Sequence, residues 1–567
     1  MNMKTKLLLG QLLVEKKIIT PQQLEIALKK QKGTDELLGS TLIKLGFVDE
    51  EAIIVPILAE QLGVDLVNLK NLEIRPEIIA RISPKFASYY KIIPIDHGDN
   101  TLTIACAHPL DIETIDGVGV VVQLKIKTVL ASEKDIAEAI RKYYGVGAET
   151  IDRMMDSAQV KKKTVKKAAE EVEEIGSEAS IGKFVNQILN EAYRDRATDI
   201  HIEPYEKELK IRYRIDGILY DTQLPTNIWH FKDAINSRIK IMSNLNIAEK
   251  RLPQDGRFKA KVDDLELDLR VSFLPTQWGE SVGIRILSSS KLYNLRQLGL
   301  SESDSNILQD LIKKPHGIIF LTGPTGSGKT TTLYSCLAHV NQADKKIITI
   351  EDPIEYQLKG VTQIQINPGI GLTFGAGLRS MLRHDPDIMM VGEVRDLETA
   401  RIAIQVALTG HLVFSTLHTN NAASGVTRLI DMGIEPYLIA SSVECFIAQR
   451  LIRLICPKCK IPAKVTPDII ADFGLTAEEA SQLKIYEGKG CEACKFTGYH
   501  GREGIYEFLL VGDEIQELIT ARVSATQINN KAVALGMRTL LQDGFSKVKQ
   551  GKTTPSEVLR VTKEETA

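Results

Sequence analysis

The stretch of the chain that decides its fold reads Gly323-Pro324-Thr325-Gly326-Ser327-Gly328-Lys329-Thr330, followed by Thr331. An apolar run precedes it and an apolar-periodic segment follows it, so the pattern predicts a strand, a tight loop and a helix. Glycines let such a loop curl so that its backbone N–H groups face phosphate oxygens, and the start of the helix adds a favourable dipole. Lys329 can reach the β- and γ-phosphates, and the Thr330 hydroxyl can ligate Mg²⁺. The sequence therefore predicts that this loop binds and hydrolyses ATP.

Apolar runs alternate with helical segments on both sides of the loop. Strands are predicted at 317–321, 346–350, 387–391 and 411–415. This order is typical of a mostly parallel sheet that is covered on both faces. Ligands of such sheets bind beyond the carboxyl ends of the strands.

Three candidate catalytic residues follow predicted strands. Glu393 comes after the third strand, where a carboxylate can hold Mg²⁺ or its waters. Glu355 follows the second strand and can orient the attacking water. It shares that stretch with Glu351 and Asp352, and three carboxylates this close repel one another unless a cation or arginines lie nearby. His418 follows the fourth strand and can sense the γ-phosphate. The simpler alternatives are ordinary strand-end carboxylates and a structural histidine.

The whole chain is too long for a single core, since 567 residues suggest three or four domains of about 150 residues each. The formal net charge of −2 argues against nucleic acid as a partner, because duplex DNA binding usually needs clustered Lys and Arg. No window reaches the ~18 apolar residues that a membrane span needs. We expect a cytoplasmic protein whose contact with a membrane passes through a partner.

Four parts are expected along the chain. Residues 1–145 mix amphipathic helices with short strands, and residues 146–176 form a charged linker or an exposed helix. Residues 177–290 form a small α+β domain, and residues 296–567 form the α/β domain around the loop. Within the small domain we expect a helix at 184–193, strands at 209–215, 265–273 and 281–287, and a hairpin turn at Asp216-Gly217.

Seven cysteines are present, and four of them form two short-spaced pairs, Cys456/Cys459 and Cys491/Cys494. Four thiolates suit a tetrahedral, structural Zn²⁺, and disulfides are rare in cytosolic proteins. We therefore predict a zinc module at 456–494 that contains a small helical insert at 466–483. The other three, Cys106, Cys336 and Cys445, lie in apolar surroundings and are expected to be buried.

Several segments, met in order, resemble the type II/type IV secretion ATPases, the GspE and PilB group. They are 196–204, 251–257, the loop at 323–330, 351–356, 382–387, 392–396 and 415–420. The resemblance implies a multidomain α/β protein with a RecA-like P-loop NTPase domain, a small PAS-like α+β domain and a zinc-binding insert. It also implies a homohexamer in which the small domain brings Arg270 and Arg285 to the phosphates. Further arginines that match are Arg257, Arg379, Arg383, Arg395 and Arg502.

Within this family, the long N-terminal region is most similar to the PilB-type branch. The resemblance then implies an ATPase that powers type IV pilus assembly at the inner membrane through a platform protein of the PilC/GspF kind. A type II secretion ATPase is the alternative. A nucleic-acid translocase and a scaffold that binds ATP without turnover are further alternatives.

Two N-terminal segments, 9–31 and 38–61, look like duplicated helical hairpins. They resemble the MshE-type N-terminal domain, whose tandem motifs bind cyclic di-GMP. The family motif begins with Arg-Leu-Gly, but Leu8 and Leu37 stand at the arginine positions here, and Lys17 replaces a usual glycine. Arginine is the residue best suited to phosphate and guanine recognition. Cyclic di-GMP and docking on a platform protein therefore stay open as alternatives.

Overall fold

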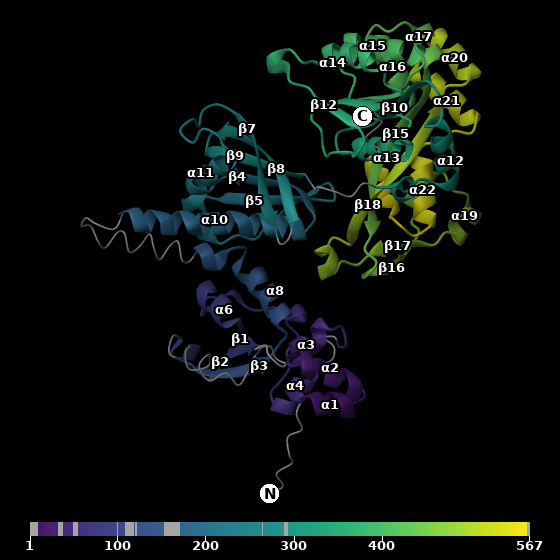
Figure 1. Cartoon of the computed structure of the whole chain (residues 1–567). Coiled ribbons are helices and arrows are strands. Elements are labelled where there is room, and N and C mark those ends of the chain that lie inside the picture. Colours follow the sequence, from purple (N-terminus) through teal and green to yellow (C-terminus); the bar gives the residue numbers. More distant parts are fainter. Residues whose placement is uncertain are drawn as a thin grey trace. The chain divides into compact units, whose positions relative to one another are not determined.

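The computed structural model describes residues 9–31, 38–48, 55–98, 100–107, 118–119, 122–151, 170–262, 265–287 and 293–563. The chain divides into two compact units, Met1–Leu287 and Ser288–Ala567 (Figure 1). Each unit is described by itself below. Within the described residues, no helix is both long enough and apolar enough to cross a membrane.

The first unit begins with four short helices, which are α1 (Leu9–Glu15), α2 (Pro21–Gln31), α3 (Leu38–Lys44) and α4 (Val55–Leu62). The turns after α1 and α3 are equivalent at an offset of 29 residues, in agreement with a duplication. Ile18 N–H donates to Leu13 O, and Phe47 N–H donates to Leu42 O, at 2.9 and 3.1 Å. Lys17 has a left-handed φ of +58°, where the second copy has a glycine at +69°.

A small α/β layer follows the four helices. Its elements are α5 (Pro76–Ile79), α6 (Pro84–Tyr90), β1 (Ile92–Gly98), β2 (Thr101–Cys106), β3 (Lys125–Leu130) and α8 (Glu133–Tyr144). The strands pair in the order β1-β2-β3, with β1 antiparallel and β3 parallel to β2. Helices α5, α6 and α8 pack on the sheet through one cluster of buried residues.

The rest of the first unit is a six-stranded antiparallel sheet of order β6-β5-β4-β9-β8-β7. Its elements are α10 (Glu170–Arg194), β4 (Ala197–Pro204), β5 (Leu209–Ile215), β6 (Ile218–Asp221), α11 (Lys232–Met242), β7 (Gln254–Val262), β8 (Leu265–Thr276) and β9 (Gly279–Leu287). Helices α10 and α11 share its buried core. The predicted helix and strands of this part are confirmed. Asp216 and Gly217 both have positive φ, at +49° and +90°, as a two-residue hairpin turn of this kind requires.

The first residues of the predicted linker are packed against the rest of the first unit. Val146, Ala148 and Ile151 are buried, and Ile151 belongs to the same core cluster as Phe184 of α10. The lysine and glutamate runs that follow dominate the composition of 146–176, so the sequence pattern did not single out these three apolar residues. Residues 152–169 lie outside the described part of the chain, and α10 begins at Glu170.

The second unit is built on a seven-stranded sheet of order β12-β11-β13-β14-β10-β15-β18, in which only β18 is antiparallel to its neighbour. The strands are β10 (Gly317–Thr322), β11 (Ile347–Glu351), β12 (Thr362–Gln365), β13 (Ile388–Val391), β14 (Leu412–Leu417), β15 (Val443–Ile455) and β18 (Tyr499–Leu510). The four predicted strands are β10, β11, β13 and β14, and the mostly parallel sheet is confirmed.

Helices lie on both faces of this sheet (Figure 1). They are α12 (Glu302–Leu311), α13 (Lys329–Val340), α14 (Phe374–Met381), α15 (Leu397–Leu408), α16 (Ala423–Asp431), α17 (Pro436–Ser442), α20 (Asp513–Thr520), α21 (Ala525–Ala534), α22 (Leu540–Lys549) and α23 (Pro555–Thr562). Alternate residues of β10 enter opposite cores. Ile318 and Phe320 join the cluster under α14 to α17, whereas Ile319 and Leu321 join the cluster under α12 and α13. The sheet is therefore buried on both faces, as predicted.

The segment inserted between β15 and β18 contains both cysteine pairs. Its elements are β16 (Lys460–Ala463), α18 (Pro467–Phe473), α19 (Ala477–Gln482) and β17 (Ile485–Gly488). The two helices confirm the predicted helical insert. The three remaining cysteines are buried as expected, and burial raises the pKa of the Cys336 thiol to about 12.

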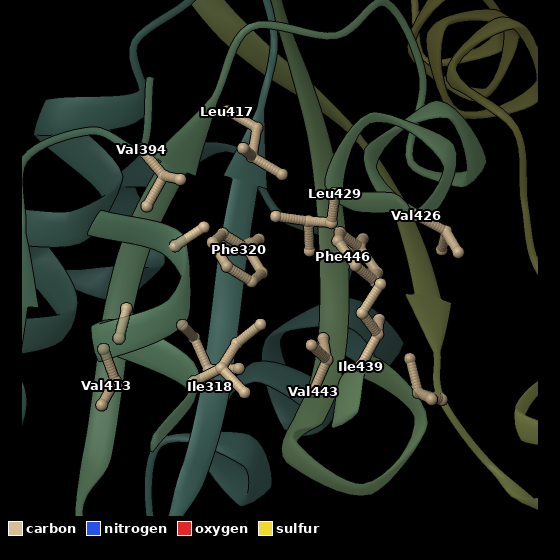
Figure 2. Packing of buried hydrophobic residues seen from close by; sticks show 14 of the residues in the cluster. Ile318, Phe320, Val394, Val413, Leu417, Val426, Leu429, Ile439, Val443 and Phe446 are labelled. Carbon is tan, nitrogen blue, oxygen red and sulfur yellow. The ribbon is translucent and has the colours of Figure 1, made fainter. Parts of the chain in front are cut away.

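Replacing Phe320 by alanine should destabilise the second unit by about 3–5 kcal/mol. The ring is fully buried and stacks on Phe446 of the neighbouring strand, with 5.5 Å between the ring centres (Figure 2). Calorimetry of the full chain should show a lower midpoint temperature for the thermal transition in which the second unit unfolds. Ile370→Ala is the matched control, because Ile370 is 77% exposed and surface truncations usually change stability by less than about 0.5 kcal/mol. Equal shifts for the two variants would contradict this account of the core.

Candidate active site

The phosphate-binding loop connects β10 to α13 and depends on its glycines. Gly323, Gly326 and Gly328 have φ values of +148°, +81° and +88°. A side chain at Gly323 or Gly328 would also collide with β15, since a Cβ there would lie 2.6 or 2.8 Å from atoms of Gln449. The predicted strand, loop and helix are therefore present, with glycine where the backbone demands it.

Two buried polar side chains of the loop can donate hydrogen bonds to an anion. Lys329 is buried, and its Nζ donates to the carbonyl oxygens of Gly323 and Pro324 at 2.7 and 3.0 Å. Burial and the nearby Arg450 lower the pKa of Lys329 to about 8, while Glu393 acts to raise it. The buried Ser327 hydroxyl has no hydrogen-bond partner in the part of the chain that the structure describes. A buried donor without a partner is costly, so this loop fits a phosphate group.

Glu393 and His418, predicted from separate strands, lie together. Glu393 follows β13 and is 9% exposed. Its carboxylate pairs with Arg395 and lies 3.3 Å from His418 Nε2. The structure brings both residues to the edge of the sheet that also holds Lys329, whose pKa responds to Glu393. Their proposed roles at the metal and the γ-phosphate remain predictions.

The three carboxylates of the acidic stretch after β11 lie in different surroundings. Glu351 is buried and accepts hydrogen bonds from three side chains. Its carboxylate accepts from the hydroxyl of Tyr334, from Thr349 Oγ1 at 2.6 Å and from Gln363 Nε2 at 3.1 Å. Asp352 is exposed, and Glu355 is half-buried with its backbone N–H on the Tyr334 hydroxyl at 3.3 Å. The three carboxylates thus differ in burial, and the expected cation or arginines beside them remain a prediction.

The matched arginines of the first unit form a row across its antiparallel sheet. Arg257, Arg270 and Arg285 are directly opposite one another on β7, β8 and β9, and Arg285 is opposite Asp199 on β4. Directly opposed residues share one face of a sheet. Arg285 Nε donates to Asp199 Oδ1 at 2.8 Å, and Arg257 pairs with Asp268. A role of Arg270 and Arg285 at the phosphates remains a prediction.

The matched arginines of the second unit lie in different surroundings. Arg395 belongs to the site, because it pairs with Glu393. Arg379 pairs with Glu398 on α15, and Arg383 donates to the carbonyl of Arg379 at 2.8 Å. Arg502 is opposite Arg453 on the paired strands β15 and β18.

Two residues of β15 near the loop were missed by the sequence analysis. Gln449 is 2% exposed, and its Oε1 accepts a hydrogen bond from Thr332 Oγ1 at 2.9 Å, which fixes α13 to the sheet. Arg450 is 7% exposed and donates to Asn420 O at 2.8 Å. The signal that could have found them is an uncharged polar residue and an arginine side by side in an otherwise apolar run.

The two cysteine pairs converge on one point. The Sγ atoms of Cys456 and Cys491, and those of Cys459 and Cys494, are 3.8 Å apart, and all four lie within 4.8 Å of one another. A disulfide would need about 2.05 Å, whereas four sulfurs at about 2.3 Å from a tetrahedral zinc lie roughly 3.8 Å apart. The backbone N–H groups of Cys491 and Gly498 donate to the sulfur of Cys494 at 3.2 and 3.3 Å. The cluster therefore fits Zn²⁺.

The cyclic di-GMP partner implied for the N-terminal repeats stays a prediction. The leading positions of the two motifs, Leu8 and Leu37, lie outside the described residues.

Comparisons with known proteins cover nearly the whole chain. The family model "Type II/IV secretion system protein" matches residues 174–560, and the MshEN domain model matches residues 62–150. The type IV pilus assembly ATPase PilB of Myxococcus xanthus is 41% identical over 97% of this chain and 98% of its own. The type II secretion system protein E of Xanthomonas campestris is also 41% identical, again over 97% and 98%.

One solved structure supports the fold. The X-ray structure of the ATPase DotB from Yersinia pseudotuberculosis covers 67% of this chain and 94% of its own, at 19% identity and a TM-score of 0.50. These findings confirm the predicted multidomain α/β fold and the predicted enzyme class, a P-loop ATPase. With a family model over more than half of its residues and relatives along nearly its full length, the chain belongs to the type II/IV secretion system protein family.

Proposed function

We propose that this ATPase acts as a Mg²⁺-dependent homohexamer that powers type IV pilus assembly through an inner-membrane platform protein. The observation that carries the enzymatic part is the meeting of Lys329, Glu393 and His418 at one edge of the parallel sheet. The pilus relative, similar along its whole length, supports the biological part. The near-neutral charge of the chain supports a protein partner rather than nucleic acid.

Each residue of the site has a proposed task. The loop at 323–331 and Lys329 hold the phosphates of ATP, and Thr330 and Glu393 hold Mg²⁺, which supplies positive charge beside the transferred phosphoryl group. Glu355 orients the attacking water, and His418 senses the γ-phosphate. Arg270 and Arg285 stabilise the charge that develops in the transition state.

Replacing Glu355 or Glu393 by glutamine should lower kcat by about 100-fold or more, because each change removes a charge needed in the hydrolytic step. The dissociation constant for a fluorescent ATP analogue should change little, since the loop and Lys329 remain. Glu517→Gln on α20 is the matched control for the loss of a surface carboxylate and should keep full activity. Normal turnover in both active-site variants would show that the site is assigned wrongly.

We further propose that the four clustered cysteines hold one structural zinc ion per chain. Chelation should release about one zinc per chain and lower the midpoint of thermal unfolding, because metal binding contributes directly to the stability of such modules. Cys491→Ser should lose the zinc, measured by elemental analysis. Cys106→Ala, in the other unit, should keep it. A metal-free native protein with four reactive thiols would contradict the assignment.

Type II secretion is the second candidate, and the equally similar secretion relative supports it. Deletion of the gene in the native host should abolish surface pili and leave the export of secreted enzymes intact. Complementation with Glu355→Gln should fail, which ties the phenotype to hydrolysis. The reverse outcome, with pili kept and secreted enzymes retained in the cell, would favour the type II assignment.

A further inference from the structure

The loop that carries Glu355 is held by side chains from two other elements. The backbone N–H of Glu355 donates to the hydroxyl of Tyr334 at 3.3 Å. Gln363 on β12 binds the same loop twice, through Nε2 to the carbonyl of Tyr356 at 3.2 Å and through Oε1 to the N–H of Leu358 at 2.7 Å. The loop is therefore fixed by three hydrogen bonds from outside itself.

The Tyr334 hydroxyl is itself fixed in direction. It donates its proton to the buried carboxylate of Glu351, which also accepts from Thr349 and Gln363. Hydrogen bonds to an ionised carboxylate are stronger than those between neutral groups. Burial, followed by the nearby Glu351, raises the pKa of Tyr334, so the phenol keeps its proton. Since the proton points to Glu351, the hydroxyl oxygen acts as an acceptor, and it receives the Glu355 N–H and, at 3.4 Å, Gln363 Nε2.

Tyr334 lies on α13, the helix that begins at Lys329 and contains Thr330. We propose that Tyr334 is a positioning residue for ATP hydrolysis, whose hydroxyl holds the Glu355 loop at a fixed offset from the phosphate-binding helix. The bond goes to the backbone of Glu355, so it sets where the carboxylate lies without contacting substrate. This inference rests on the proposed role of Glu355.

The neighbouring Tyr356 provides an internal control. Its ring contacts that of Tyr334 edge-on, with 4.5 Å between the ring centres. Its hydroxyl is also buried, but it has no hydrogen-bond partner among the residues that the structure describes. Removing either hydroxyl deletes one oxygen from the same cluster. Only the change at Tyr334 removes a bond to the Glu355 loop.

The test compares Tyr334→Phe with Tyr356→Phe in the full-length protein. We expect Tyr334→Phe to lower kcat by about tenfold, the rate equivalent of the lost bond to Glu355, while KM and the affinity for a fluorescent ATP analogue stay within about twofold. Tyr356→Phe should keep full activity. Gln363→Leu cuts the other two bonds to the loop, together with the bonds from Gln363 to Glu351 and to the Tyr334 hydroxyl. It should lower kcat in the same selective way. Equal activity of the two tyrosine variants, or a loss of nucleotide affinity alone, would overturn the proposal.

A double variant separates positioning from general damage to the fold. In single-turnover reactions, adding Tyr334→Phe to Glu355→Gln should cause no further loss, because the tyrosine acts through a residue that is already disabled. A further tenfold loss would overturn the proposal. If Tyr334→Phe is normal and Glu355→Gln inactive, the positioning role alone fails. If Glu355→Gln turns over normally, the proposed base and the positioning role both fail.

Discussion

The parallel pairing of β10, β11, β13 and β14 is the constraint on which the rest of the molecule depends. These strands are hydrogen-bonded in register, with Val391 beside Ser415 and Leu321 beside Thr416. Because they run in the same direction, their carboxyl ends meet at one edge. The loop to Lys329, the Glu355 loop, Glu393 and His418 all follow those ends. The site is thus assembled by the sheet from segments up to about a hundred residues apart.

Much of this arrangement could be predicted, because the strands are buried on both faces and therefore appear as continuous apolar runs. The loop could be predicted because its glycines meet a backbone requirement. What could not be predicted depends on partners far away in the sequence. Glu351 looked like one of three repelling carboxylates, yet Tyr334 and Gln363 bind it. Gln449 and Arg450 were missed, although they lie against the phosphate-binding loop and its helix.

Two carboxylates near the site, Glu351 and Glu393, have different kinds of partners. Glu351 is buried and satisfied by neutral donors, so it serves as a fixed anchor. Glu393, 9% exposed, is paired with Arg395 and lies near His418, both of which are more exposed than the carboxylate itself. Pairs with one exposed partner are weak enough to exchange that partner. The two carboxylates therefore differ in their partners: those of Glu351 are buried or half-buried, whereas those of Glu393 are exposed.

Helix α13 connects the phosphate-binding loop to the loop that carries Glu355. It begins with Lys329 and Thr330. Thr332 is hydrogen-bonded to Gln449, and Tyr334 is part of the buried cluster under α12 and α13. With seven of its 12 residues buried, α13 is a closely packed element that carries both Lys329 and Tyr334. In the proposed positioning role, the Tyr334 hydroxyl holds the Glu355 loop at a fixed offset from this helix. A hydrogen bond worth about 1 kcal/mol is sufficient for this task, because it has only to select one position of a loop that Gln363 already restrains.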